Sequence, residues 1–417
     1  MTRSTGEGGT VASDLQVLVD HLAEHVGAST VLEDHGQRTI AHSSQRGPID
    51  QTRRDSILHR VTPPETVAWF RSFGIDRGRG PVAVPANDAL GILPRLCTPV
   101  RYRGQLLGFL WVIDNDGSIA ERFLEVLEKA AEHAGVLLYE EQLAQRLTSQ
   151  ALSHLLSPSE ELRNAAVQQI ADQSLLPDDQ PLVSVVVQPL DVDEPDLDMS
   201  LAVEEALSDV GWEAPTSSFL RRACGDHSVL LVRVRACDDD SPAFNLALAA
   251  RAALVRRLSG GTGHAPRVVA ALGDPQGRLE QAVASYRQAR LAIKVAAAFP
   301  AISDVVRWSN LGVFRALAQL TTKEAQESAL DPRVLSLLEA GDETVVSTLE
   351  TYLDLAGDVK ATAEALHMHR GTLYYRLEKA ERIAGVDFHN GYDRLAVHLG
   401  LKLARLAGRR VAATPAR

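Results

Sequence analysis

A segment near the C-terminus gathers basic, hydroxyl-bearing and aromatic side chains at close spacing. Its members are His369, Arg370, Gly371, Thr372, Tyr374, Tyr375, Arg376 and Lys379. Arginine can donate two hydrogen bonds to O6 and N7 of guanine, whereas hydroxyl groups and cationic side chains bind phosphate oxygens. The chemistry that this segment predicts is non-covalent recognition of double-stranded DNA.

A short helix over residues 359–366 is predicted to lead into this segment. Asp358 can cap its N-terminus, because the carboxylate accepts a backbone N–H. Gly357 stands where a positive φ often ends the preceding helix. Ala363 is predicted on the inner face, where a small side chain allows a second helix to cross closely.

The second predicted helix covers residues 369–384. Leu373, Leu377 and Ala380 recur at i, i+4 and i+7 and therefore share an inward face. The polar side chains of the segment then point outward or flank that face. Only His367 and Met368 separate the two helices, which indicates a helix-turn-helix with crossing helices.

The same spacing also fits a solvated amphipathic helix in a bundle, and spacing alone leaves both interpretations open. Charge distribution adds a weak argument for DNA. Residues 358–410 contain ten Lys/Arg and six Asp/Glu, a net charge of +4, although the whole chain has a formal net charge of −11. Binding of nucleic acid depends on where charges lie and not on their total.

Residues 349–403 resemble the C-terminal helix-turn-helix of the PucR/CdaR family of bacterial regulators. The resemblance rests on TYLDLAGDVKATAEALHMHRGTLYYRLEKAERIAGVDF and on the final helix DRLAVHLGLKLARL. The family usually has Asn where this chain has Gly371, and often Arg where it has Tyr374. These departures concern the base contacts and leave the expected fold unchanged.

The preceding region resembles the GGDEF-like domain of the same family. The tracts that carry this resemblance are VVAALGDPQGRLEQAVASYRQARLAIKVAAAF and SDVVRWSNLGVFRALAQL. Strand-like and helical patterns alternate over residues 182–299, which predicts an α/β domain with a mixed sheet. A working cyclase would need two glycines and several acids at its central turn, but residues 223–228 read ACGDHS. We therefore predict no enzyme activity and no cofactor.

The N-terminal region is predicted to be an α+β sensor of GAF or PAS type. A helix over residues 14–26 precedes four strand-like runs, and the tract LCTPVRYRGQLLGFLWVID loosely resembles the closing hairpin of a GAF domain. The predicted strands cover residues 30–32, 39–41, 96–100 and 108–112, with a hairpin turn at 101–104. Residues 31–40 and 90–112 would line any pocket, but they specify no ligand.

Residues 120–156 read as one long helix. Leucine and alanine alternate spacings of three and four along it, as in a coiled-coil seam, at Leu124, Leu127, Ala131, Ala134 and Leu138. We interpret it as a dimerising signal helix between sensor and output. The alternative is a terminal helix that packs on its own domain.

Cysteine and histidine positions argue against other site types. Cys97, Cys224 and Cys237 are few and scattered, which argues against a disulfide framework and suggests a reducing compartment. His21 and His25 share a helix face but have no third ligand, so no metal site is predicted. The chain also shows no secretory signal and no run of about 18 apolar residues, which predicts a cytoplasmic protein without membrane contact.

The sequence thus predicts an α+β multidomain protein that binds a DNA operator as a homodimer and responds to an unknown small-molecule effector. The rival interpretation is a signalling receptor or nucleotide-binding protein whose helical tail binds protein partners. The expected segments are 1–12 disordered, 13–119 GAF/PAS-like sensor, 120–157 linker helix, 158–325 degenerate GGDEF-like domain, 332–408 all-α helix-turn-helix domain and 409–417 flexible tail.

Overall fold

The computed structural model describes most of the chain. The described residues are 11–45, 47–59, 62–176, 180–190, 197–213, 219–237, 239–259, 266–320 and 328–409. The chain divides into two compact units, Met1–Leu147 and Thr148–Arg417. The expected disordered N-terminus and flexible C-terminal tail lie almost wholly outside the described residues. Within the described ranges, no helix combines the length and apolarity that crossing a bilayer requires.

The first unit is built on a five-stranded antiparallel sheet with strand order β2-β1-β5-β4-β3. The strands are β1 (Thr30–Asp34), β2 (Thr39–His42), β3 (Val82–Val84), β4 (Arg95–Tyr102) and β5 (Gln105–Ile113). The turn between β4 and β5 has positive φ at Arg103 and Gly104, which suits the twist of a tight hairpin. The four predicted strands and this hairpin are confirmed, whereas β3 was not predicted.

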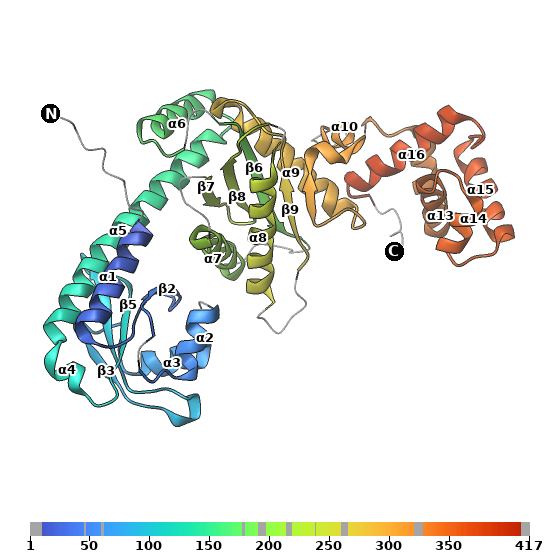
Figure 1. Cartoon of the computed structure of the whole chain (residues 1–417). Coiled ribbons are helices and arrows are strands. Elements are labelled where there is room, and N and C mark those ends of the chain that lie inside the picture. The colour runs from blue at the N-terminus through green and yellow to red at the C-terminus, as the bar shows by residue number, and fades with distance from the viewer. Residues whose placement is uncertain are drawn as a thin grey trace. The chain divides into compact units, whose positions relative to one another are not determined.

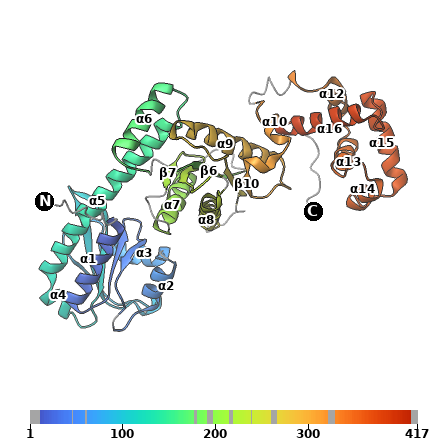
Figure 2. The same ribbon diagram turned by 45° about the horizontal axis from the view of Figure 1, so that its top comes forward.

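Helices cover both faces of this sheet. α1 (Val11–Val26) and α5 (Leu124–Leu155) run side by side along one face, as Figures 1 and 2 show, and share its apolar core. α2 (Gln51–His59) and α3 (Pro64–Ser72) belong to the other face, where Phe70 packs against Trp111 with ring centroids 4.5 Å apart. Neither α2 nor α3 was predicted.

The long predicted helix is present, but its expected seam is not free. It forms as α4 (Ser118–Arg122) and α5, with Phe123 between them. Four seam positions are buried in the core of the first unit: Leu127, Ala131, Ala134 and Leu138. For this stretch the alternative of a helix packed on its own domain is correct, because α1 and the sheet already cover these side chains.

The second unit begins with a five-stranded mixed sheet of strand order β10-β9-β6-β8-β7. The strands are β6 (Leu182–Pro189), β7 (Phe219–Ala223), β8 (Ser228–Arg233), β9 (Val268–Leu272) and β10 (Val305–Arg307), of which β9 and β10 pair in parallel. α7 (Leu197–Glu213) and α8 (Ser241–Leu258) pack on one face. α6 (Glu160–Asp172), α9 (Ala282–Ala298) and the end of α5 pack on the other (Figure 2). The predicted α/β domain is confirmed.

The rest of the second unit is helical. α10 (Phe314–Ala318) packs on the sheet domain, and five helices share a separate apolar core. They are α12 (Pro332–Glu339), α13 (Glu343–Asp354), α14 (Val359–Ala365), α15 (Arg370–Ala384) and α16 (Gly391–Leu406). The end of α16 also reaches the sheet domain, since Leu406 belongs to its core and Lys402 lies 5.4 Å from the Phe299 ring centroid.

Candidate nucleic-acid interface

The N-terminus of α14 is formed as the sequence predicts. The Asp358 side chain accepts a hydrogen bond from the backbone N–H of Ala361 at 2.9 Å. Gly357 has φ +82°, and a Cβ built there would lie 2.3 Å from a guanidinium nitrogen of Arg394. The positive φ therefore favours glycine at position 357, whereas the flexible Arg394 side chain could move away from a larger residue.

The turn between α14 and α15 is tight. His367 adopts φ +48°, and the N–H of Met368 returns to the carbonyl of Ala363 at 2.9 Å. Ala363 is only 7% exposed and lies in the helical core, as predicted for the small residue at the helix crossing. This left-handed residue reverses the chain in two positions, which fixes the angle at which α15 departs.

α15 starts one residue later than the sequence predicted. His369 is its N-cap, and Nδ1 accepts a hydrogen bond from the N–H of Gly371 at 3.1 Å. Leu373, Leu377 and Ala380 are buried in the helical core, which confirms the predicted inward face. These contacts hold the helix so that its opposite side faces solvent.

The exposed side of α15 carries most of the predicted DNA-contacting residues. His369, Arg370, Gly371, Thr372, Tyr374 and Tyr375 are all exposed, the two tyrosines by 52% and 65%. A shallow depression beside them runs between α14 and α15 and is lined in part by Lys360, His367 and Arg370. A Cβ on Gly371 would meet only the His369 ring, at 3.4 Å, so packing does not require glycine there.

Arg376 and Lys379 flank the inward face of α15, and both side chains contact α13 or its N-cap. Arg376 donates through Nη1 to Thr348 Oγ1 at 3.0 Å, and Lys379 Nζ lies 2.5 Å from Asp342 Oδ2. The Lys379 hydrogen bond holds the pKa of Asp342 well below its usual range. Both side chains are half-buried and tie α15 to α13, because their positions flank the apolar stripe.

Sequence reasoning also passed over Arg382. This residue is exposed and lies seven positions after Tyr375, which places it on the same helix face. Its cationic side chain can contact phosphate further along a DNA backbone. The helical periodicity that identified the inward residues of α15 also places Arg382 on the outward face and could have identified it.

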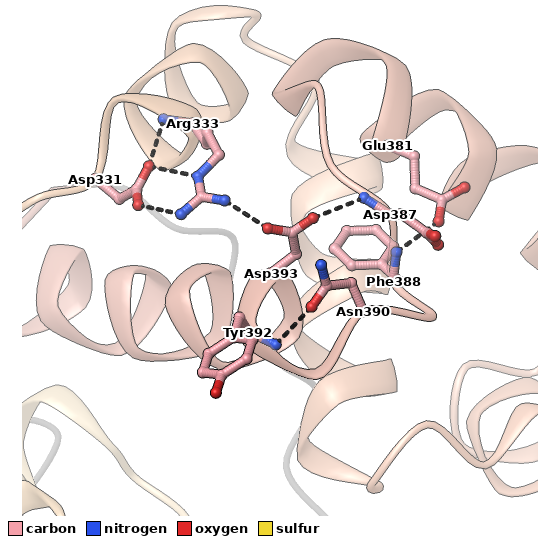
Figure 3. Close-up of polar contacts among 8 residues, drawn as sticks. All are labelled: Asp331, Arg333, Glu381, Asp387, Phe388, Asn390, Tyr392 and Asp393. Carbon is pink, nitrogen blue, oxygen red and sulfur yellow. Dashed lines mark hydrogen bonds and ion pairs between the residues drawn. The ribbon is translucent and has the colours of Figure 1, made fainter.

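A polar network holds the loop that follows α15 (Figure 3). Asp393 accepts from Arg333 Nη1 at 2.6 Å and from the N–H of Asp387 at 3.2 Å, while Glu381 accepts from the N–H of Phe388 at 2.8 Å. Glu381, Asp387 and His389 bring their ligand atoms within 4.8 Å of one another. These carboxylates already accept hydrogen bonds from the backbone of the loop. We therefore interpret the group as a structural one, which stabilises the packing of α15 against α12 and α16.

The β7–β8 hairpin carries the residues ACGDHS at its turn. Asp226 lies 2.6 Å from Nδ1 of His227 and 3.7 Å from Nη1 of Arg290. The other ring nitrogen of His227 contacts the hydroxyl of Tyr286 at 3.0 Å. Burial lowers the pKa of His227, with Arg290 adding to the shift. The single acid of this turn therefore takes part in a hydrogen-bonded network within the protein.

Two family models match this chain. The PucR C-terminal helix-turn-helix domain matches residues 345–403, and a GGDEF-like domain matches residues 159–295. The proline-responsive transcriptional activator PutR of Bacillus subtilis (strain 168) is 22% identical over 415 residues, which cover 94% of this chain and 97% of PutR. The DNA-binding transcriptional activator AdeR of the same organism is 20% identical over 412 residues, covering 94% and 93%.

A third relative from the same organism matches a shorter region. The purine catabolism regulatory protein is 34% identical over 65 residues, which cover 16% of this chain and 12% of that protein. The family models coincide with the sheet domain and with helices α13 to α16, and two relatives match along nearly the whole chain. This chain therefore carries a PucR-type C-terminal helix-turn-helix domain behind a GGDEF-like domain, and it is similar to DNA-binding transcriptional regulators along nearly its whole length.

Proposed function

We propose that the chain reads its operator with the N-terminal half of α15, acting as a homodimer whose first unit receives a small-molecule signal. The observation that carries the proposal is the exposed, capped start of α15 on a buried helical scaffold. Arg370 and Thr372 stand at the position from which a recognition helix contacts base edges in the major groove. Tyr374, Tyr375 and Gly371 complete the contact surface.

Arg376 and Lys379 act in this proposal mainly by holding the recognition helix. Their contacts with Thr348 and Asp342 orient α15 on α13. Their partly exposed cationic groups still add positive potential beside the DNA backbone, which favours binding of any duplex. Arg382 extends that potential along the same face.

The first unit is, in this proposal, a GAF-like signal-receiving domain. An antiparallel sheet with helices on both faces supports that assignment, as does the description of the relative PutR as proline-responsive. The GGDEF-like domain has a structural role without catalysis, since the acid of its central turn is engaged by His227 and Arg290.

Replacing Arg370 with alanine should weaken operator binding by about 10- to 100-fold and reduce discrimination against a scrambled duplex, because a bidentate base contact is lost. Fluorescence anisotropy of the full chain, with DNA from its own upstream region and at two salt concentrations, measures both quantities. Arg287→Ala is the matched control, because this exposed arginine lies on α9 of the sheet domain. An equal loss for native and scrambled DNA would contradict base readout by Arg370.

Leu143 and Leu147 supply an exposed apolar pair for the proposed dimer. They stand at i and i+4 of α5 and are 47% and 37% exposed. We expect Leu143→Glu combined with Leu147→Glu to convert a dimer into a monomer and to weaken operator binding, because two half-sites can then no longer be bound together. Size-exclusion chromatography with light scattering measures the mass. Wild-type protein that is monomeric at micromolar concentration would refute the dimer.

A further inference from the structure

The first unit contains a group of charged and polar side chains sealed between its sheet and the helices α2 and α3. We call it the buried polar cluster, and its members are Glu33, Gln37, Asp50, Arg53, Arg95 and Trp111. Their exposed fractions lie between 0 and 7%. Charged side chains are almost never buried to this degree unless they are paired, so each partner has to be accounted for.

Arg95 and Asp50 neutralise each other's charge. The guanidinium of Arg95 forms an ion pair with Asp50 and lies 5.1 Å from the centroid of the Phe70 ring. Asp50 also accepts two backbone N–H groups, those of Arg53 and Leu93, each at 2.7 Å. The Asp50 carboxylate thus accepts hydrogen bonds from Arg95 and from two backbone N–H groups, and neither Nη1 nor Nη2 of Arg53 contributes a hydrogen bond to it.

Arg53 is the member of the cluster whose hydrogen-bond donors lack partners. Its side chain is 2% exposed, yet Nη1 and Nη2 find no hydrogen-bond partner among the residues that the structure describes. Burial lowers the pKa of Arg53 and Arg95 lowers it further, whereas the nearby charges of Glu33 and Asp50 raise it. Neither carboxylate forms a hydrogen bond with Nη1 or Nη2, and buried donors that are left unpaired are unfavourable. The planar pair of donors on Arg53 matches a carboxylate in a two-point hydrogen bond. Arg53 therefore points to an anionic planar group supplied from outside the chain.

Glu33, the second member without a full set of partners, lacks a hydrogen-bond donor, whereas Arg53 lacks an acceptor. Oε1 accepts from the hydroxyl of Thr62 at 3.3 Å, but Oε2 has no donor within the described ranges. Burial raises the pKa of Glu33 to about 7, and the charge of Arg53 is the largest influence that opposes this rise. The indole N–H of the neighbouring Trp111, which is a hydrogen-bond donor, and the charge of Arg95 also lower the pKa of Glu33, and Asp34 raises it. A donor that carries positive charge would satisfy Oε2.

Gln37 adds to the cluster a buried amide without hydrogen-bond partners. It follows β1, is 0% exposed, and has neither Oε1 nor Nε2 paired within the part of the chain that is described. An inorganic anion would satisfy Arg53 but would leave Glu33 without a donor. A simple cation would do the reverse. Only a molecule that carries both an anionic and a cationic group can form hydrogen bonds with Arg53, Glu33 and Gln37 and add no net charge to the buried site.

We propose that the buried polar cluster binds a free α-amino acid, with its carboxylate on Arg53 and its ammonium group on Glu33. The Gln37 amide supplies a further hydrogen bond, and Val31, Phe70 and Phe109 of the surrounding apolar core face the rest of the ligand. This inference rests on the proposed function only in taking amino acid binding as the signal. The binding itself is tested independently of DNA.

The test uses the full-length wild-type protein and each of the twenty L-amino acids in a thermal unfolding assay. We expect one or a few amino acids to raise the Tm. The N-acetyl and carboxamide derivatives of each active amino acid should not, since each lacks one of the two charges. Inorganic phosphate and succinate test for an anion site alone. No shift with any amino acid, or an equal shift with the derivatives, would overturn the proposal.

Two substitutions then locate the site. Arg53→Lys keeps a charge but loses the planar pair of donors, and Glu33→Gln removes the acceptor charge. Each should weaken binding of the active amino acid at least about tenfold in calorimetric titration. Arg54→Gln is the matched control, because this exposed neighbour lies on the same helix. Undiminished binding by both correctly folded variants would place the amino acid elsewhere and refute the assignment.

Operator binding, measured with and without the active amino acid, separates the two hypotheses. A change in operator affinity supports both of them. Amino acid binding without any effect on operator affinity leaves the site standing and removes its role as the signal. Amino acid binding by a protein that binds no operator overturns the proposed function and leaves the site intact.

Discussion

Replacing Glu350 with alanine should lower the free energy of unfolding by about 3–5 kcal/mol, because it leaves buried cations without their anion. Glu350 on α13 is 0% exposed and contacts Lys402 Nζ at 2.8 Å and Arg405 Nη2 at 2.5 Å, both on α16. The loss should appear in urea denaturation followed by circular dichroism. DNA affinity should fall with it, since α13 is also the helix that Arg376 and Lys379 contact.

Two comparisons test the cause of that loss. Glu343→Ala removes an exposed carboxylate from the first turn of the same helix and should change stability by well under 1 kcal/mol. Glu350→Leu combined with Lys402→Met and Arg405→Met should recover much of the stability, because a buried ion network can be replaced by apolar groups of similar size. A loss below about 1 kcal/mol for Glu350→Ala would contradict the argument.

Gly273→Ala should destabilise the GGDEF-like domain by about 3 kcal/mol, at the upper end of what overpacking costs. A Cβ built at this position would lie 2.0 Å from the carbonyl oxygen of Ser285 on α9. Ser285 cannot withdraw easily, because its hydroxyl accepts the N–H of Ser184 on β6 at 2.9 Å. The measurement is the thermal midpoint of the full chain together with hydrogen exchange of β6.

Gly277 provides the control for this substitution. It lies in the same connection between β9 and α9, has no positive φ, and has no heavy atom within 4 Å of a built Cβ. Gly277→Ala should therefore leave stability unchanged or slightly higher, since alanine restricts the unfolded chain. Equal effects at the two glycines would show that chain flexibility, and not the contact with Ser285, decides the outcome.

The helix-turn-helix was predictable to within a residue or two because its determinants are local. Asp358 at the N-cap, Gly357 at positive φ and the inward Leu373 and Leu377 are signals contained in a few turns of chain. Helix periodicity and capping act over such distances whatever the rest of the protein does. The family resemblance then selected DNA binding over a plain bundle.

The orientation of Arg376 and Lys379 depended on distant sequence. Their partners Thr348 and Asp342 lie 28 and 37 residues earlier, on a helix whose packing against α15 no local pattern specifies. A basic residue beside an apolar stripe can face solvent or a neighbouring helix. Tertiary packing decides between these two orientations, so the sequence predicted their positions on the helix but not their partners.

The helix α2 was missed altogether by sequence reasoning. Its sequence QTRRDSILH has scarcely any amphipathic pattern and was not predicted as a helix, yet it packs Thr52, Arg53 and Ser56 into the interior. A polar segment that is buried by its neighbours breaks the hydrophobic pattern from which sequence reasoning starts. The same break conceals the residues to which we assign ligand binding.

The N-cap of α15 also determines which ring nitrogen of His369 is protonated at the surface that we propose faces DNA. A ring nitrogen accepts a hydrogen bond only through its lone pair, so Nδ1 of His369, which faces the N–H of Gly371, carries no proton. In that tautomer the hydrogen of the neutral imidazole is on Nε2. The exposed edge of the ring is then a donor, complementary to a phosphate oxygen or to guanine N7 and mismatched to the amino groups of adenine and cytosine.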